Sequence, residues 1–251
     1  MSDFRTSWVP AVNFEPRRDG RKPDLLILHY TGMSSAAKAV DWLCREESKV
    51  SCHYLIDEDG AVVGMVDEAM RAWHAGISHW QGETDINSCS IGIEIHNGGS
   101  DMGLPDYPDA QMRSVIQLSR AIMARHGIPP ERVLAHSDIA PARKIDPGER
   151  FDWERLAKFG IGVWVPAAPI EGDRGLGVGD SGEAVRNMQA QLSNLGFGLA
   201  STGQFDHPTE TVVKAFQRHW RQRKVDGRAD RSTLLTLGRV AERIGGKRLS
   251  S

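Results

Sequence analysis

Residues 25–28 are four consecutive aliphatic residues, Leu-Leu-Ile-Leu, with a polar segment before them and His29 directly after them. A short uninterrupted apolar run is typical of a strand that is buried on both faces, as in a sheet covered by helices. Residues 34–43 follow with two serines and an Ala-rich stretch, which predicts a capped helix. A buried strand that leads into a helix indicates an α/β fold, with His29 brought to a surface at the end of the strand.

The chain continues this alternation of strands and helices. Residues 52–66 hold two apolar runs joined by Asp-Glu-Asp-Gly, which is typical of a hairpin with glycine at its turn. Residues 90–95 alternate small or polar side chains with isoleucine, as a strand does, and residues 112–123 carry apolar side chains at helical spacing. A short apolar run at residues 133–135 then predicts a strand that presents His136.

A break in this pattern divides the chain into two parts. Residues 165–177 contain prolines and glycines without periodicity, which is typical of a linker. Beyond them, apolar residues at helical spacing predict a compact bundle of three short helices, at residues 185–195, 212–220 and 234–244. We therefore predict a first domain at residues 1–165, a linker at 166–176 and a separate all-α domain at 177–245.

The charge of the chain also changes at this break. The net charge of −2 gives no reason to expect a nucleic acid as partner, but it combines two opposite parts. From Gly172 onward, 13 Lys and Arg stand against 8 Asp and Glu, whereas the residues before it hold 18 against 25. Three cysteines without close spacing predict no disulfide framework. No apolar run is long enough for a signal peptide or a transmembrane segment.

Seven of the nine histidines lie at or before His136, so metal-binding chemistry is concentrated in the first domain. Two imidazoles and one carboxylate leave the fourth position of a tetrahedral zinc open to water, as in catalytic zinc sites. His29, His136 and Asp146 are candidates for this set. A zinc hydrolase also needs a proton acceptor and a cation for the oxyanion, for which Glu94 and Lys144 have suitable chemistry. Because no His-Glu-x-x-His motif is present, spacing alone leaves this hypothesis open.

Five short motifs occur in order within residues 20–165. They are His-Tyr-Thr at 29–31, Ser-Cys-His-Tyr-Leu-Ile at 51–56, Ala-Trp-His-Ala-Gly at 72–76, Ser-Ile-Gly-Ile-Glu at 90–94 and His-Ser-Asp-Ile-Ala-Pro-Ala-Arg-Lys-Ile-Asp-Pro-Gly at 136–148. Together they closely resemble the zinc-dependent N-acetylmuramoyl-L-alanine amidases, which are relatives of the peptidoglycan recognition proteins. The ordered set is highly specific, although no single motif is.

The resemblance implies a central mixed β-sheet flanked by helices and a hydrolase that takes peptidoglycan or a muropeptide as its substrate. The bond cleaved would be the amide between N-acetylmuramic acid and the L-alanine of the stem peptide. Zn2+ would be the cofactor, held by His29, His136 and Asp146. Glu94 would be the base for the attacking water, and Lys144 would stabilise the tetrahedral oxyanion.

The resemblance also marks stretches that border the substrate cleft in this family. The candidate substrate-binding residues in them are Arg71, Trp73, His74 and Asn87. Of these, Arg71 is the candidate partner of a stem-peptide carboxylate. The adjacent His79 and Trp80 are candidates for lining a groove or for a structural role.

Residues 175–240 resemble the three-helix peptidoglycan-binding module that is often attached to wall hydrolases. The resemblance rests on Leu-Gly-Val-Gly-Asp-Ser-Gly at 176–182, Leu-Gly-Phe at 195–197 and Asp-Gly at 226–227. Residues 218–224, Arg-His-Trp-Arg-Gln-Arg-Lys, are more basic than this pattern, and we interpret them as a solvated helix end. The alternative is a surface for anionic glycans or peptide carboxylates.

The sequence leaves the compartment and the size of the substrate open. A wall-binding module favours intact peptidoglycan in the periplasm or cell envelope. The absence of a visible signal peptide favours the cytoplasm and a soluble 1,6-anhydro-muropeptide instead. No amphipathic face beyond those of the expected cores stands out, so a monomer is expected.

Two other classes of function compete with the amidase hypothesis. His136-Ser137-Asp138 matches the His-x-Asp of iron oxygenases that use two histidines and one carboxylate, but this site needs a further downstream histidine. The candidates are His207 and His219, which we expect in the separate C-terminal unit. The second class is a non-catalytic peptidoglycan-binding protein, which the presence of every matched ligand and catalytic position disfavours.

Overall fold

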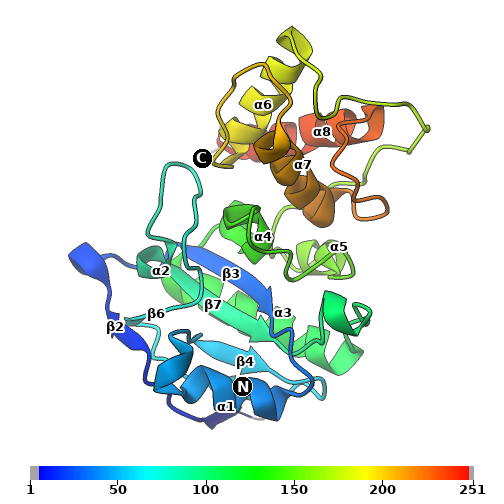
Figure 1. Cartoon of the computed structure of the whole chain (residues 1–251). Helices are drawn as coiled ribbons and strands as arrows, with labels where there is room; N and C mark the ends of the chain where they lie inside the picture. The colour runs from blue at the N-terminus through cyan, green and yellow to red at the C-terminus, as the bar shows by residue number, and fades with distance from the viewer. Residues whose placement is uncertain (1–5, 249–251) are drawn as a thin grey trace.

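The computed structural model describes residues 6–248, which form a mixed six-stranded sheet, helices on both of its faces and a helical C-terminal domain (Figure 1). Among the described residues, β4–β5 is the antiparallel pair of this sheet, and its other neighbouring strands are parallel. The predicted mixed sheet is confirmed. Its strands, in spatial order, are β1 (Thr6–Trp8), β5 (Val62–Gly64), β4 (Tyr54–Ile56), β7 (Ser90–Ile95), β3 (Leu25–Tyr30) and β8 (Val133–Ala135).

A two-stranded antiparallel ribbon, β2 (Phe14–Pro16) with β6 (Met70–Ala72), lies beside the main sheet. Neither this ribbon nor β1 was expected from the sequence. Each of these strands has three residues, too few for a period of two to be recognised.

Two helices of the first domain, at 36–44 and 109–126, confirm the helices expected at 34–43 and 112–123, whereas its three short helices were not expected. Ser35 caps α1 by accepting a hydrogen bond from the backbone N–H of Lys38. The long helix α3 ends where Gly127 takes the left-handed conformation, with φ of 68°. The helices of this domain are α1 (Ala36–Cys44), α2 (Ile86–Cys89), α3 (Asp109–His126), α4 (His136–Ile139) and α5 (Trp153–Ala157).

The alternation of side chains along β3 divides the sheet into two differently covered faces. Leu26 and Leu28 belong to the core that is shared with α3, whereas Leu25 and Ile27 belong to the core on the opposite face. His29 continues the odd-numbered series and therefore lies on the second face. On the neighbouring strand β7, the isoleucines join the α3 core, so Glu94 also lies on the second face.

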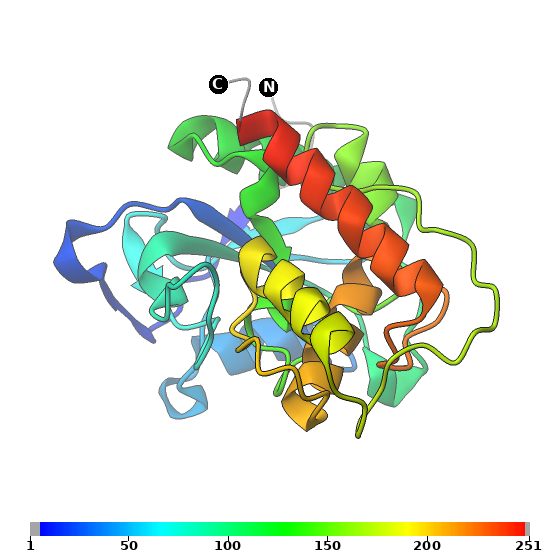
Figure 2. The same cartoon turned by 90° about the horizontal axis from the view of Figure 1, so that it is seen from above.

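The C-terminal domain consists of α6 (Glu183–Leu195), α7 (His207–Trp220) and α8 (Arg231–Arg248), as the sequence predicts. Asp206 and Asp230 accept hydrogen bonds from the backbone N–H groups of Thr209 and Thr233, at 2.9 and 2.8 Å, and so begin α7 and α8. Helices α6 and α8 pack together and run over the second face of the sheet (Figure 2).

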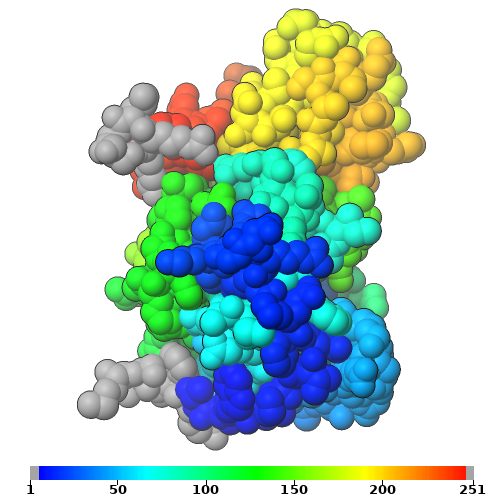
Figure 3. All heavy atoms as spheres, turned by 90° about the vertical axis from the view of Figure 1, so that its left-hand side faces the viewer, coloured from blue at the N-terminus to red at the C-terminus, as the bar shows by residue number. Residues whose placement is uncertain are grey.

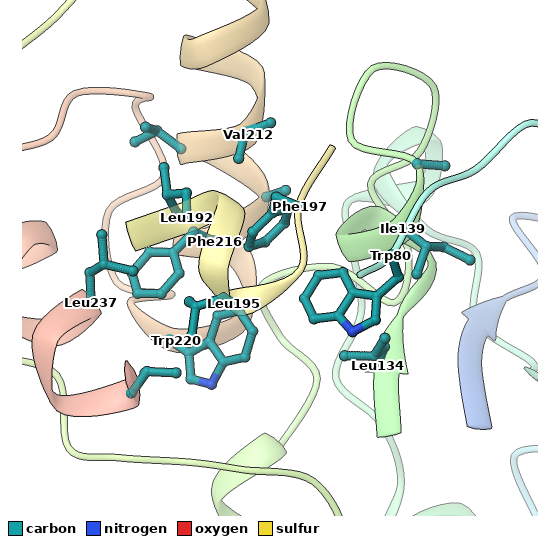
Figure 4. Close-up of a cluster of buried hydrophobic side chains, with 14 of the residues drawn as sticks. Trp80, Leu134, Ile139, Leu192, Leu195, Phe197, Val212, Phe216, Trp220 and Leu237 are labelled. Carbon is teal, nitrogen blue, oxygen red and sulfur yellow. The ribbon is translucent and has the colours of Figure 1, made fainter. Parts of the chain in front are cut away.

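The C-terminal domain packs directly against the first domain, because side chains of both belong to one hydrophobic core. Trp80, Leu134 and Ile139 of the first domain belong to the same buried cluster as the C-terminal side chains (Figure 4). The indole of Trp80 is 2% exposed and meets Phe197 edge-to-face at 5.1 Å. Trp80 is therefore structural and lines no groove.

Hydrogen bonds also join the two domains. The space-filling view shows the C-terminal domain in direct contact with the first domain (Figure 3). The backbone N–H of Gln81 donates to Gly196 O at 2.9 Å, and the indole N–H of Trp220 donates to Val163 O at 2.8 Å. Our interpretation of residues 218–224 as a solvated helix end is also wrong in part. His219, Trp220 and Arg221 are all buried, the last against Asp230 and Thr233.

No helix within residues 6–248 combines the length and the hydropathy that crossing a bilayer requires.

Candidate metal centre and catalytic site

Three neighbouring parallel strands bring the candidate residues to one edge of the sheet. β3 and β7 lie in a register that pairs His29 with Glu94. β8 lies on the other side of β3 and ends at Ala135, so α4 begins with His136 beside them. Because the carboxyl ends of parallel strands meet at one edge, residues far apart in sequence converge there.

His29, His136 and Asp146 converge on one point, as the sequence predicts. Nδ1 of His29 lies 2.8 Å from Nδ1 of His136. Oδ2 of Asp146 lies 3.3 Å from the first nitrogen and 3.0 Å from the second. All three side chains are buried. The backbone holds the set together, because the N–H of Ser137 donates to Asp146 O at 3.0 Å.

A chain of hydrogen bonds behind His29 determines which of its nitrogens is free. Ser90 Oγ donates its one hydrogen to Ile86 O at 2.6 Å, so it accepts from His74 Nε2 at 3.0 Å. A neutral His74 then has only an acceptor at Nδ1, which receives the Nε2 hydrogen of His29 at 3.0 Å. The unprotonated nitrogen of His29 is therefore Nδ1, the atom that faces His136.

His136 is oriented in the same way by a carbonyl group. Its Nε2 lies 3.2 Å from Ala75 O, which can only accept, so Nδ1 carries the lone pair. Two nitrogen lone pairs and a carboxylate oxygen then face one another with no proton between them, an arrangement that a cation stabilises. A small tetrahedral metal ion with bonds of about 2.0–2.1 Å keeps its ligand atoms about 3.3–3.4 Å apart, close to the distances seen here. The residues present therefore fit a metal ion.

The charges of the site agree with this donor set. Burial, together with the neighbouring His136, lowers the pKa of His29 to about 4 against the opposing effect of Asp146, so this imidazole is neutral at pH 7. Burial alone would raise the pKa of Asp146, but His136 and His29 outweigh it and hold this pKa well below its usual range. A neutral His29 and an ionised Asp146 are the protonation states that metal ligands need.

Glu94 and Lys144 line the cavity in front of this centre, which has a volume of about 490 Å³. Burial, with a contribution from the charge of Asp146, raises the pKa of Glu94 well above its usual range, and its Oε2 is buried without a hydrogen-bond partner among the described residues. Lys144 forms no ion pair with any residue in the range 6–248. The apolar part of the cavity lining comes from Met33, Trp42, Leu43 and Val50.

One of the four candidate substrate-binding residues, His74, lines this cavity, and it also backs His29. Arg71 lies outside the cavity lining, and its guanidinium is paired with Glu15 and with Asp85, at 2.5 and 2.8 Å. Asn87 accepts the backbone N–H groups of residues 74 and 75 and so fixes that loop. A contact of these residues, or of Trp73, with substrate stays a prediction.

Two residues of this site were missed by sequence reasoning. Ser90 ends the hydrogen-bond chain behind His29, and Gly92 leaves the space in which the His74 ring lies. The sequence does contain a signal for both, because small residues alternate with isoleucines at 90–95. From this alternation only the strand itself was predicted. The backbone N–H of Gly92 also donates to Nδ1 of His53 at 3.0 Å.

The iron-oxygenase alternative assumed that His219 lies away from the first domain, and this assumption is wrong. Nδ1 of His219 lies 2.7 Å from Oδ2 of Asp138. Within residues 6–248, however, the set of His, Cys, Asp and Glu side chains whose ligand atoms all converge within 4.8 Å is His29, His136 and Asp146. Asp138 and His219 therefore pair with each other outside this centre.

A mixed sheet with two histidines, one aspartate and a half-buried glutamate at its edge is typical of a metal-dependent hydrolase. Residues 19–149 match the family model for N-acetylmuramoyl-L-alanine amidase, and residues 181–237 match the model for a peptidoglycan binding domain. The chain belongs to the N-acetylmuramoyl-L-alanine amidase family.

Named relatives agree with this assignment. The chain is 33% identical to N-acetylmuramoyl-L-alanine amidase AmiD of Escherichia coli strain K12, over 88% of this chain and 83% of the relative. It is 34% identical to 1,6-anhydro-N-acetylmuramyl-L-alanine amidase AmpD of Salmonella typhimurium strain SL1344, over 59% of this chain and 86% of that protein. The solved complex of E. coli AmiD with anhydro-N-acetylmuramic acid-L-Ala-D-gamma-Glu-L-Lys superposes with a TM-score of 0.76, at 33% identity, over 92% and 91% of the two chains.

These findings identify the chain as an enzyme, an N-acetylmuramoyl-L-alanine amidase that acts on a peptidoglycan-derived substrate. They disfavour the binding-protein and iron-oxygenase alternatives.

Proposed function

We propose that the metal is zinc and that it is held by His29, His136 and Asp146. The observation that carries this proposal is the convergence of two imidazole lone pairs and one carboxylate oxygen on a single point. Three nitrogen and oxygen ligands with an open fourth position are the pattern of catalytic zinc. When bound, zinc lowers the pKa of a coordinated water to about 7 and polarises a carbonyl group.

We propose that Glu94 is the general base. Its side chain lines the cavity beside Asp146, and the pKa raised by burial brings this carboxyl group closer to the pH at which the enzyme works. Glu94 takes a proton from the attacking water and then gives it to the nitrogen of L-alanine as the amide bond breaks. The products are a carboxylate on the lactyl group of the muramic acid and a peptide with a free amino terminus.

Lys144 is proposed to stabilise the oxyanion that develops on the scissile carbonyl. Its ammonium group lines the cavity and has no carboxylate partner among residues 6–248, so its charge is available to substrate. A cation that is already in place when negative charge develops lowers the barrier without reorganisation.

The substrate that this arrangement favours is a muramyl peptide of the polymeric wall. The C-terminal domain supports this choice, because a peptidoglycan-binding module has little use on a small soluble substrate. The proposed metal ligands, Glu94 and Lys144 lie together within one chain, so the proposed mechanism needs no residue from a second copy.

The test uses Glu94→Gln and Asp146→Ala with sacculi and with 1,6-anhydro-muropeptides as parallel substrates, the products being identified by mass spectrometry. Glu94→Gln is expected to keep its metal and to lose about 10²–10⁴-fold in kcat. Asp146→Ala is expected to lose both metal and turnover, and chelation of the wild-type metal followed by Zn2+ should abolish and restore turnover. Unchanged turnover of Glu94→Gln would contradict the assignment of Glu94 as the base. Faster release of stem peptide from anhydro-muropeptides than from sacculi would contradict the polymeric substrate.

A further inference from the structure

His219 of the C-terminal domain reaches the loop that carries a metal ligand. It lies near the end of α7, and its imidazole is stacked between Trp153, at 3.8 Å, and Trp220, at 3.7 Å between ring centroids. Its Nδ1 lies 2.7 Å from Oδ2 of Asp138, which is two residues after His136. Both side chains are at most 1% exposed, so the contact is closed to water.

Asp138 transmits this contact to the backbone that positions His136. The same Oδ2 accepts the N–H of Ala135 at 2.8 Å, so it fixes the residue directly before the ligand. Helix α4 has only four residues, and a helix this short has little stability of its own. The first turn, which carries His136, therefore depends on the tertiary contacts at its side chains.

The pairing of His219 with Asp138 is specific and is not explained by packing alone. Asp138 Oδ1 and His219 Nε2 are buried without hydrogen-bond partners among the described residues, so each side chain gives up solvation for the bonds at Oδ2. An apolar ring would fill the space between the two tryptophans without this cost. A carboxylate offers only acceptors, so Nδ1 of His219 is the donor.

We propose that His219 is a positioning residue for the metal centre: through Asp138 it fixes the turn that holds His136. The C-terminal domain is then part of the catalytic apparatus as well as a wall-binding module. This inference rests on the proposed metal site at His29, His136 and Asp146.

Two substitutions separate the hydrogen bond from the stacking. His219→Phe keeps a ring between Trp153 and Trp220 but removes the donor. His219→Asn removes the ring but keeps an N–H at the same number of bonds from Cβ as Nδ1. The affinity of each full-length apoprotein for Zn2+ is measured by competition with a chromophoric chelator, and kcat and KM are measured on an anhydro-muropeptide. Circular dichroism establishes that each variant is folded at the temperature used.

His219→Phe is expected to bind Zn2+ about 10–100-fold more weakly and to lose kcat with little change in KM, since outer contacts of metal ligands typically have effects of this size. His219→Asn is expected to recover most of the Zn2+ affinity although it packs less well. Gln222→Ala is the matched control, because Gln222 donates to Phe151 O at 2.8 Å across the same interface without touching α4. It is expected to bind Zn2+ as the wild type does.

Wild-type Zn2+ affinity in His219→Phe would overturn the inference. Equal losses of Zn2+ affinity in His219→Phe, His219→Asn and Gln222→Ala would also overturn it, because they would show a general loosening of the interface. Asp146→Ala distinguishes this result from failure of the proposed metal site. If Asp146→Ala weakens Zn2+ binding and His219→Phe does not, only the role of His219 is wrong. If Asp146→Ala leaves Zn2+ binding unchanged, the metal site itself is wrong.

Discussion

Gly92→Ala tests whether the space beneath the His74 ring is needed for metal binding. Gly92 lies in β7, and a Cβ added there would come within 2.5–2.8 Å of three ring atoms of His74. The ring is buried and hydrogen-bonded to His29 and to Ser90, so moving it away would break these bonds. The substitution therefore displaces the imidazole that orients His29.

Gly92→Ala is expected to have two effects, one on the free energy of unfolding and one on the metal centre. Displacing a buried ring from a packed core costs about 1–3 kcal/mol of the free energy of unfolding. Breaking the hydrogen bond from His29 Nε2 to His74 removes the group that fixes the tautomer of a metal ligand, which typically costs about 10–100-fold in metal affinity or activity. Since a factor of ten is about 1.4 kcal/mol, the second effect is about 1.4–2.8 kcal/mol at the metal centre.

The assay is Zn2+ affinity by chelator competition, together with kcat and the free energy of unfolding in urea. Gly64→Ala is the matched control, because its Cβ would meet the ring of Trp8 in β1, and that ring is 56% exposed and free to move into solvent. Gly64→Ala should leave Zn2+ affinity unchanged. Wild-type Zn2+ affinity and kcat in a folded Gly92→Ala would refute the reasoning about His74.

Two predictions concern stability. Burial would raise the pKa of Glu68, but its hydrogen bonds with Arg125, Tyr54 and His126 outweigh this effect and lower the pKa to about 2. The carboxylate therefore stabilises the fold above its unfolded pKa of about 4.5. This stabilisation is lost as the pH falls toward 2. Glu68→Gln should therefore lower the free energy of unfolding in urea by about 1.5–3 kcal/mol at pH 7, and this loss should shrink below pH 4.5. A loss that does not depend on pH would contradict the prediction. Trp80→Ala should cost about 3–5 kcal/mol and lower the melting temperature of both domains together; loss of only one of two separate transitions would contradict the shared core.

Much of the fold was predictable because its signals are local. The run at 25–28, the alternation at 90–95 and the helical spacing at 112–123 each identify an element from adjacent residues. β1 and the β2–β6 ribbon were not predicted, because these three-residue strands contain no apolar run, unlike the strand at 133–135. Tertiary pairing of this kind carries no periodic signal within the strand itself.

The convergence of His29, His136 and Asp146 could be predicted only through the resemblance to a family, because spacing alone left this hypothesis open. The same resemblance placed His74 and Asn87 near the cleft but could not give the direction of their side chains. His74 lies over Gly92 and faces His29, and Asn87 is occupied by two backbone N–H groups. These orientations depend on strand register and on a residue without a side chain, neither of which a motif records.

The position of the C-terminal domain follows from physics that no single segment shows. The apolar spacing of Val212, Phe216 and Trp220 indicates which side of α7 is buried, but not that part of this side meets the first domain. His219 lies in the basic segment 218–224, which was interpreted from the sequence as a solvated helix end. Its burial against Asp138 requires the second face of the sheet to be covered by α4 and then by α7. Trp80 and Ile139 belong to the buried cluster that the two domains share. The C-terminal domain therefore completes the fold of the catalytic domain, in addition to any contact that it makes with the wall.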